Sequence, residues 1–180
     1  MAVEYINKTT QIQNVFMKDI ISNIQEPVIS GLLLSKISLA GNYGVEFTVD
    51  PKSRLSPLPL YIDETMMVNI LGNLINNAIE AASQNDGVNR KKVKLLIVED
   101  KKGIKITIKD NGVGMTEEVS RNIFKPNFST KSAKRGLGLY NLKKSLDLLD
   151  GTVRVATAQN KGSSFFVFIP FKGGKSNEQH

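Results

Sequence analysis

The sequence has no cysteine among its 180 residues and a single histidine, at the last position. Without cysteine there is no disulfide framework and no metal site built from thiolates. No apolar run reaches the roughly 18 residues that a membrane-spanning helix needs, and residues 1–4 do not resemble a signal peptide. What remains is an ordinary globular composition, 41% hydrophobic and 23% charged, long enough for one well-buried domain.

Positive charge is in excess, with a formal net charge of +7, and such an excess is one mark of proteins that bind nucleic acids. Much of it lies in short runs at residues 90–92, 101–102 and 143–144, interleaved with turns and acidic residues. Runs of this kind usually form solvated loops, so we expect no nucleic-acid partner. The charges at 131, 134 and 135 differ, because they directly precede a glycine loop and can serve a bound polyphosphate.

Hydrophobic periodicity predicts the elements of the fold. The expected helices cover residues 4–24, 28–40 and 63–83, a short capped turn after Thr116, and residues 138–149, and Asp63 is the expected N-cap of the third. The expected strands cover residues 45–49, 94–99, 104–109, 152–157 and 164–169, with a polar loop at 84–92. Because the last four strands pair mostly as hairpins, we expect an α+β two-layer sandwich with a mixed, mostly antiparallel sheet backed by helices.

The helix predicted at 63–83 carries amides where charged residues would serve solvent better. Asn73 and Asn77 are four residues apart and therefore stand one above the other, with Asn69, Asn76 and Glu80 on the same side. Asparagine is a mediocre helix former, and amide oxygens suit a hard cation such as Mg²⁺ that also contacts phosphates. The stripe therefore indicates either a metal–phosphate site or a plain solvent-facing surface.

Two glycine segments follow. Asp110 ends a strand directly before Asn-Gly-Val-Gly114, where the carboxylate can accept a hydrogen bond from an exocyclic amine such as that of adenine, unless this is an ordinary turn. Residues 136–139, Gly-Leu-Gly-Leu, open a helix and can form an anion site or merely a surface loop. They match neither a Walker P-loop nor a Rossmann fingerprint.

Taken together and in order, these motifs resemble the GHKL (Bergerat) ATP-binding fold of sensor histidine kinases, type II topoisomerases and related ATPases. Residues 73–80 resemble its N box, 110–114 its first glycine box and 123–131 its F box. Residues 135–139 resemble the second glycine box and 162–165 the third. A finer likeness, at residues 31–36, 70–75 and 128–131, is to the citrate and C4-dicarboxylate sensor kinases.

This resemblance implies a role for each matching residue, with ATP and Mg²⁺ as cofactors. Asn73 and Asn77 would be the catalytic residues, Asn77 as the Mg²⁺ ligand and Asn73 holding triphosphate and metal. Asp110 would bind the adenine amine, helped by Ser163 through its hydroxyl or a water. The remaining nucleotide-binding residues would be Gly112 and Gly114 under the base, and Lys131, Arg135, Gly136, Leu137, Gly138 and Leu139 as a lid over the phosphates. Lys134 and Asn160 depart from the family pattern, each standing where many relatives have glycine.

The resemblance also separates phosphoryl transfer from hydrolysis. Hydrolysing relatives have a glutamate general base one turn before the metal asparagine, where this sequence has Asn73, which takes no proton at neutral pH. Transfer to an external nucleophile is therefore favoured. A GHKL-type ATPase, a protein serine kinase and a basic nucleic-acid-binding protein are the alternatives.

A histidine kinase needs a phosphoacceptor histidine, and His180, in a polar tail, is a poor candidate. Residues 1–26 are therefore interpreted as the remnant of a dimerisation and phosphoacceptor hairpin, 27–171 as the catalytic ATP-binding domain and 172–180 as a disordered tail. The implied partners are the phosphoacceptor domain of the same sensor kinase and a response regulator. The implied setting is the cytoplasmic part of a dimeric membrane sensor, of which this chain would be a soluble fragment.

Overall fold

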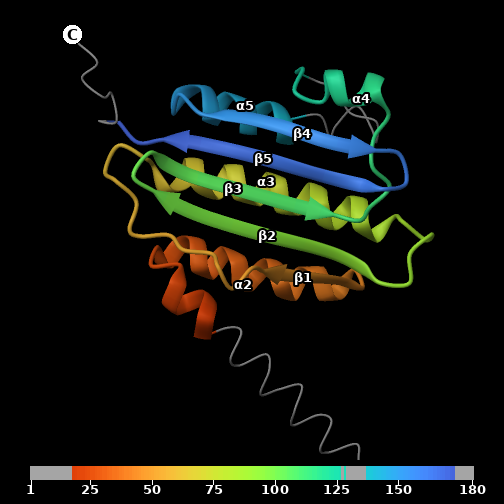
Figure 1. The fold of residues 1–180 in the computed structure, drawn as a ribbon, viewed down its shortest axis with the longest axis horizontal. Helices are drawn as coiled ribbons and strands as arrows, with labels where there is room; N and C mark the ends of the chain where they lie inside the picture. The colour runs from red at the N-terminus through yellow and green to blue at the C-terminus, as the bar shows by residue number, and fades with distance from the viewer. Residues whose placement is uncertain (1–17, 127, 129–136, 173–180) are drawn as a thin grey trace, which may run out of the picture.

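The computed structural model describes residues 18–126, 128 and 137–172. Its helices are α2 (Pro27–Asn42), α3 (Glu64–Ser83), α4 (Glu117–Asn122) and α5 (Gly138–Leu148), and residues 18–23 are also helical. Its strands are β1 (Val45–Val49), β2 (Lys91–Asp100), β3 (Gly103–Asp110), β4 (Thr152–Ala158) and β5 (Gly162–Pro170). They form one sheet in the order β1-β2-β3-β5-β4 (Figure 1).

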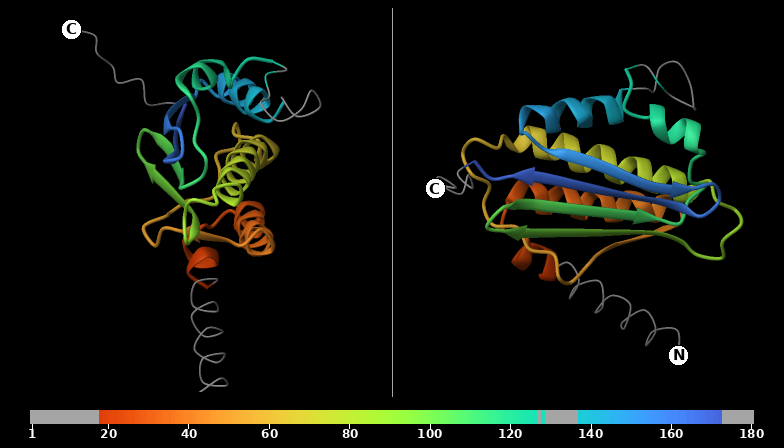
Figure 2. Two further views of the ribbon diagram at one scale, coloured as in Figure 1. Left: turned by 90° about the vertical axis from the view of Figure 1, so that its right-hand side faces the viewer. Right: turned by 45° about the horizontal axis from the view of Figure 1, so that its top comes forward.

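The sheet is mixed, as the sequence predicts. Strand β1 runs parallel to β2, and the pairs β2–β3, β3–β5 and β4–β5 are antiparallel. Helices α2, α3 and α5 lie together on one face of it (Figure 2), and the buried residues of α3 pack there against the alternate, inward residues of the strands. The expected two-layer α+β sandwich is confirmed.

Local chemistry explains where the main helices begin. Helix α3 is capped by Asp63, whose Oδ1 accepts hydrogen bonds from the backbone N–H groups of Thr65 (2.6 Å) and Met66 (3.3 Å). Helix α2 begins at Pro27, a position where the missing N–H of proline costs nothing. Helix α3 thus begins after its cap at Asp63, as predicted, and α2 begins one residue before the predicted start at 28.

Several predicted boundaries differ from the observed ones by one to three residues, and two of them are explained by their contacts. Residues 91 and 92, expected in the polar loop 84–92, belong to β2, because they pair with Val45 and Glu46 of β1. Helix α2 continues to Asn42, two residues beyond the predicted end at 40. The start of β2 is set by a partner strand distant in sequence, whereas α2 ends in a local turn, in which Tyr43 N–H donates to the Ala40 carbonyl and Gly44 N–H to the Gly41 carbonyl.

The N-terminal helical residues are joined to the sheet domain. Ile20 and Ile24 are buried in the core, and Ile24 forms a parallel bridge with Leu55. Leu55 N–H donates to the carbonyl of Asn23 (3.0 Å), and Gln25 N–H donates to the carbonyl of Leu55 (2.8 Å). The rest of the helix predicted at 4–24, and nearly all of the predicted tail, lie outside the described residues. In the described part, no helix is both long and apolar enough to cross a membrane.

Candidate functional site

A row of polar side chains crosses three neighbouring strands at one end of the sheet. Asp110 on β3 is directly opposite Ser163 on β5, and Ser163 is directly opposite Thr157 on β4. Asp110 and Ser163 are buried, on the face that the helices cover. The next inward row is apolar, so this polar row closes the end of the hydrophobic core.

Asp110 is the buried carboxylate of this row, 3% exposed. Its Oδ1 accepts hydrogen bonds from the backbone N–H groups of Gly112 (2.8 Å) and Ser163 (3.2 Å). Burial raises its pKa to about 6, although these backbone N–H groups oppose the rise. Both of these hydrogen bonds go to Oδ1, so Oδ2 is the oxygen left to accept a hydrogen bond from a ligand.

The glycine turn after Asp110 fits tightly between α3 and the β4–β5 hairpin. A Cβ on Gly112 would lie 2.4 Å from the backbone carbon of Ala81 in α3, and Val113 N–H donates to the Ala81 carbonyl (3.2 Å). Gly114 has φ +62°, and a Cβ there would lie 1.9 Å from the carbonyl oxygen of Ala158. Both predicted glycines are thus required by close backbone contact.

Two asparagines that sequence reasoning missed hold this turn. The buried Asn85 donates through Nδ2 to the carbonyls of Asn111 (2.8 Å) and Gly112 (3.1 Å). Asn111 accepts from Lys92 N–H through Oδ1 (2.7 Å) and donates to the Arg90 carbonyl (2.7 Å). A buried asparagine in a polar loop gives no local signal, because its role depends on a turn 26 residues away.

The β4–β5 turn explains one departure from the family pattern. Asn160 has φ +59°, a left-handed conformation that asparagine tolerates better than most residues. Its N–H donates to the Val113 carbonyl (2.6 Å), which ties the hairpin to the glycine turn. Asparagine therefore replaces glycine here without loss of the turn.

At the other end of the site, α3 meets the start of α5. Asn73 donates through Nδ2 to the carbonyl of Asn69 (2.7 Å), and a Cβ on Gly138 would lie 2.9 Å from Asn73 Oδ1. The structure thus brings together two predicted site residues that are 65 positions apart in the sequence. Asn77, one turn further along, is partly exposed, and no described residue hydrogen-bonds its side chain.

The amide stripe of α3 is not all available to a ligand. Asn76 Oδ1 accepts a hydrogen bond from Lys36 Nζ in α2 (2.8 Å), so this amide serves helix–helix contact. The predicted lid residues Lys131, Arg135 and Gly136 lie outside the described residues, as does Lys134. Leu137 is half-exposed before α5, and Leu139 packs partly against the core.

These residues suit a magnesium nucleotide. An open carboxylate oxygen on Asp110 can accept from an amine, and the Asn73 and Asn77 amides can supply neutral oxygens to a hard cation that keeps water and phosphate ligands. The described residues contain no cluster of three or more histidine, cysteine or acidic side chains that could hold a metal alone. The donor set therefore fits a cation that arrives with its nucleotide.

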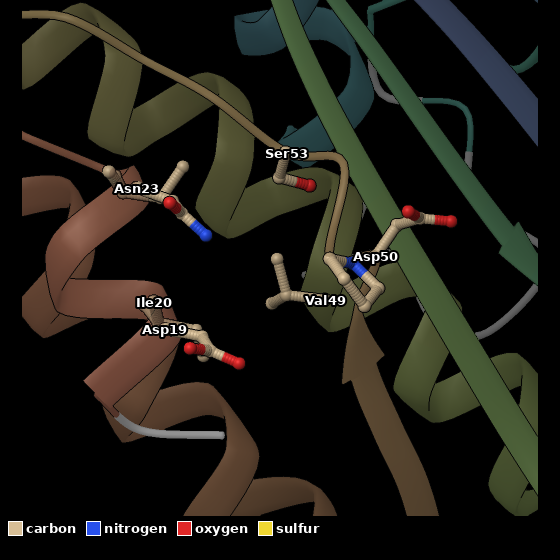
Figure 3. Close-up of a pocket in the computed structure, with 8 residues that line it drawn as sticks. Asp19, Ile20, Asn23, Val49, Asp50 and Ser53 are labelled. Carbon is tan, nitrogen blue, oxygen red and sulfur yellow. The ribbon is translucent and has the colours of Figure 1, made fainter. Parts of the chain in front are cut away.

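A small pocket elsewhere involves none of these residues. It lies between the N-terminal helical residues and the end of β1 (Figure 3), and Asp50, one of its lining residues, forms an ion pair with Lys94 (2.8 Å). The other lining residues are Asp19, Ile20, Asn23, Ile24, Val49, Pro51 and Ser53. Its position marks the junction of the N-terminal helix with the domain.

Comparison with known proteins places the chain in a family. The family described as histidine kinase-, DNA gyrase B-, and HSP90-like ATPase matches residues 62–173. The sensor protein CitS of Bacillus subtilis (strain 168) is 34% identical over 176 residues, covering 98% of this chain and 32% of CitS. The sensor histidine kinase DcuS of Escherichia coli (strain K12) is 29% identical, covering 97% of this chain and 32% of DcuS. The chain thus spans about a third of the length of these relatives.

Solved structures agree. The catalytic domain of histidine kinase ThkA superposes with a TM-score of 0.60 at 25% identity, covering 78% of this chain and 90% of that domain. The mycobacterial sensor histidine kinase MprB has the same fold, with a TM-score of 0.60 at 19% identity, covering 79% of this chain and 95% of that one. Motifs, fold and comparisons therefore agree that this chain belongs to the histidine kinase-, DNA gyrase B- and HSP90-like ATPase family, the GHKL family that its sequence resembles.

Proposed function

We propose that this chain is the catalytic domain of a two-component sensor histidine kinase. It binds ATP with Mg²⁺ and transfers the γ-phosphoryl group to a histidine nitrogen on a dimerisation segment, with ADP as the other product. Two features beside helix α3 carry the proposal. One is the buried carboxylate of Asp110, which has an oxygen left for a ligand, and the other is the close approach of Gly138 to the Asn73 amide. The family match and the CitS and DcuS likeness support it.

The proposed adenine end uses the polar row. Asp110 accepts from the amino group of the base through Oδ2, and Ser163, opposite it on β5, assists. Gly112 and Gly114 allow the backbone to pass close beneath the base, because side chains at these positions would collide with α3 and β4.

The proposed phosphate end uses α3 and the start of α5. Asn77 is the proposed Mg²⁺ ligand, and Asn73 orients the triphosphate beside Gly138. Magnesium, when bound, neutralises charge on the phosphates. Lys131, Arg135 and the segment Gly136–Leu139 are proposed as the lid that covers the phosphates.

Transfer is proposed over hydrolysis because of the residue type at 73. An amide orients but cannot take a proton from water, so the phosphoryl group awaits a separate nucleophile. A GHKL-type ATPase or serine kinase would place a carboxylate there, and Asn73 weighs against both.

The proposed partners follow from the same chemistry. The phosphoacceptor histidine is supplied by the dimerisation domain of the same sensor kinase, and the phosphoryl group passes on to a response regulator. We propose a homodimeric full-length sensor anchored in the cell membrane, with this domain on the cytoplasmic side.

Calorimetry with a non-hydrolysable ATP analogue and Mg²⁺ tests the site. Wild type should bind, whereas Asn77→Asp should lose most of the magnesium-dependent affinity and Asp110→Ala should lose nucleotide altogether. If wild type takes up no nucleotide, or if both variants bind as wild type does, the site assignment is wrong. Rapid steady ATP turnover by the chain alone, abolished in Asp110→Ala, would instead identify a hydrolytic ATPase.

A further inference from the structure

Thr157 on β4 is not among the residues predicted from the sequence, yet its hydroxyl has three partners beside Asp110. Thr157 Oγ1 lies 3.0 Å from the backbone nitrogen of Met115, 3.1 Å from the carbonyl oxygen of Gly162 and 3.0 Å from Ser163 Oγ. A hydroxyl has one hydrogen to donate and two lone pairs to accept with, so these contacts use its full capacity.

The direction of each hydrogen bond is fixed by what its partner can do. The Met115 N–H can only donate, and the Gly162 carbonyl can only accept, so the hydrogen of Thr157 goes to Gly162. The remaining contact must then run from Ser163 to Thr157, with Ser163 Oγ–H as the donor. The only hydroxyl hydrogen of Ser163 is thereby used inside the protein.

Ser163 is left with lone pairs alone to offer a bound molecule. Its opposite neighbour across the strand pair, Asp110, likewise offers an acceptor through Oδ2 once ionised, and its pKa of about 6 makes the ionised form dominant near pH 8. Two acceptors side by side complement a group with two hydrogens. A primary amine on the base, bound directly or through one water, satisfies both, whereas a base without that amine leaves both unpaired.

We propose that Thr157 is a positioning residue that sets nucleobase specificity: by taking the hydroxyl hydrogen of Ser163, it holds Ser163 as an acceptor beside Asp110, so that the site selects a 6-aminopurine. Thr157 does not itself contact the base. This inference rests on the proposed function, because it concerns how the proposed nucleotide site tells one base from another.

The test compares ADP with purine-riboside diphosphate, which lacks only the 6-amino group, in Mg²⁺-containing buffer at pH 8. Wild type should bind ADP more tightly by about tenfold or more, equivalent to about 1.4 kcal/mol, because the amine-free analogue leaves buried acceptors unpaired. Thr157→Val keeps the shape but removes the hydroxyl, and it should lower ADP affinity about tenfold while changing affinity for the amine-free analogue less than about threefold. Thr157→Ser keeps the hydroxyl and should retain the wild-type preference.

Ser163→Ala tests the same inference from the other partner. It should reduce the preference for ADP as Thr157→Val does, and the double variant should lose no more than Ser163→Ala alone, because Thr157 acts through Ser163. If Thr157→Val does not fold, Ser163→Ala and Thr157→Ser decide the question. The proposal is overturned if Ser163→Ala keeps the wild-type preference for ADP over the amine-free analogue, or if Thr157→Ser loses it.

Two results separate this inference from the proposed function. If wild type binds ADP and Thr157→Val weakens both nucleotides equally, or neither, Thr157 is only structural and the inference is wrong while the proposed function stands. If wild type binds neither nucleotide, the proposed function itself fails.

Discussion

At the scale of one residue, the buried carboxylate of Asp110 serves the proposed binding site but lowers the stability of the folded domain near neutral pH. Burial raises the pKa of this carboxyl to about 6, above its ordinary value of 3.8, although the backbone N–H groups of Gly112 and Ser163 donate to it. The folded state therefore binds a proton more readily than the unfolded state between about pH 4 and 6. Stability contributed by this group is present below pH 4 and is lost as pH rises through 6. Near neutral pH the folded domain therefore carries a buried negative charge on Asp110, which can accept a hydrogen bond from the amine of a ligand.

Replacing this carboxylate by an amide should stabilise the domain without nucleotide. Asp110→Asn keeps an oxygen for the Gly112 and Ser163 N–H groups but removes the charge. Urea unfolding at pH 7.5 should show a gain of up to about 3 kcal/mol, from a shift of about two pKa units at 1.36 kcal/mol each, and the gain should vanish near pH 4.

The exposed Asp19→Asn is the matched control and should give no such pH-dependent difference. Nucleotide binding should be lost in Asp110→Asn, because the new amide donates where an acceptor is needed. Equal stability of Asp110→Asn and wild type at pH 7.5 would show that the carboxylate is not desolvated in solution.

The contact between α3 and α5 is the feature that matters at the scale of elements. Gly138, the first residue of α5, is close enough to Asn73 that an added Cβ would lie 2.9 Å from Oδ1. Because that atom ends a side chain, Gly138→Ala should displace the amide rather than break the fold. We expect nucleotide affinity to fall about tenfold or more, the equivalent of about 1.4 kcal/mol, with stability within about 1 kcal/mol of wild type.

Gly72→Ala is the matched control, because it lies in α3 beside Asn73 in sequence but meets nothing within 4 Å. It should raise stability by about 0.5–1 kcal/mol, the helix propensity difference, and leave affinity unchanged. Thermal melts and calorimetry on the two variants measure both quantities. A Gly138→Ala variant that binds as wild type does would show that Asn73 does not orient the phosphates.

Elements were predictable from the sequence where the pattern is local. The cap at Asp63, the period of α3 and the alternation of the hairpin strands each depend on neighbours within a few residues, and each was confirmed. The pairing of β3 with β5 was not predicted, because nothing local specifies which hairpins adjoin. That pairing brings Ser163, and with it Thr157 of the same hairpin, into the row of Asp110, so the place of the hydroxyl pair beside Asp110 could not be predicted from the sequence.

At the scale of the whole molecule, the N-terminal helical residues are continuous with the core. Ile24 is 1% exposed and joined to Leu55 by a bridge, and Glu26 Oε2 accepts from Leu58 N–H (3.0 Å). The irregular loop after β1 is thus held against the end of the helix. Displacing this helix end would destabilise the domain, because the helix end and the loop cannot separate without exposing apolar surface and breaking backbone hydrogen bonds.

Ile24→Ala measures how strongly the two parts are joined. Removal of a buried isoleucine side chain should cost about 2–4 kcal/mol, in one cooperative transition with the rest of the domain. Ile21→Ala, three residues earlier and 57% exposed, should cost less than about 0.5 kcal/mol. Equal costs, or an Ile24→Ala variant that melts in two steps, would mean that the helix end is a separate unit. A single shifted transition would show that the helix end unfolds together with the sheet that carries Asp110.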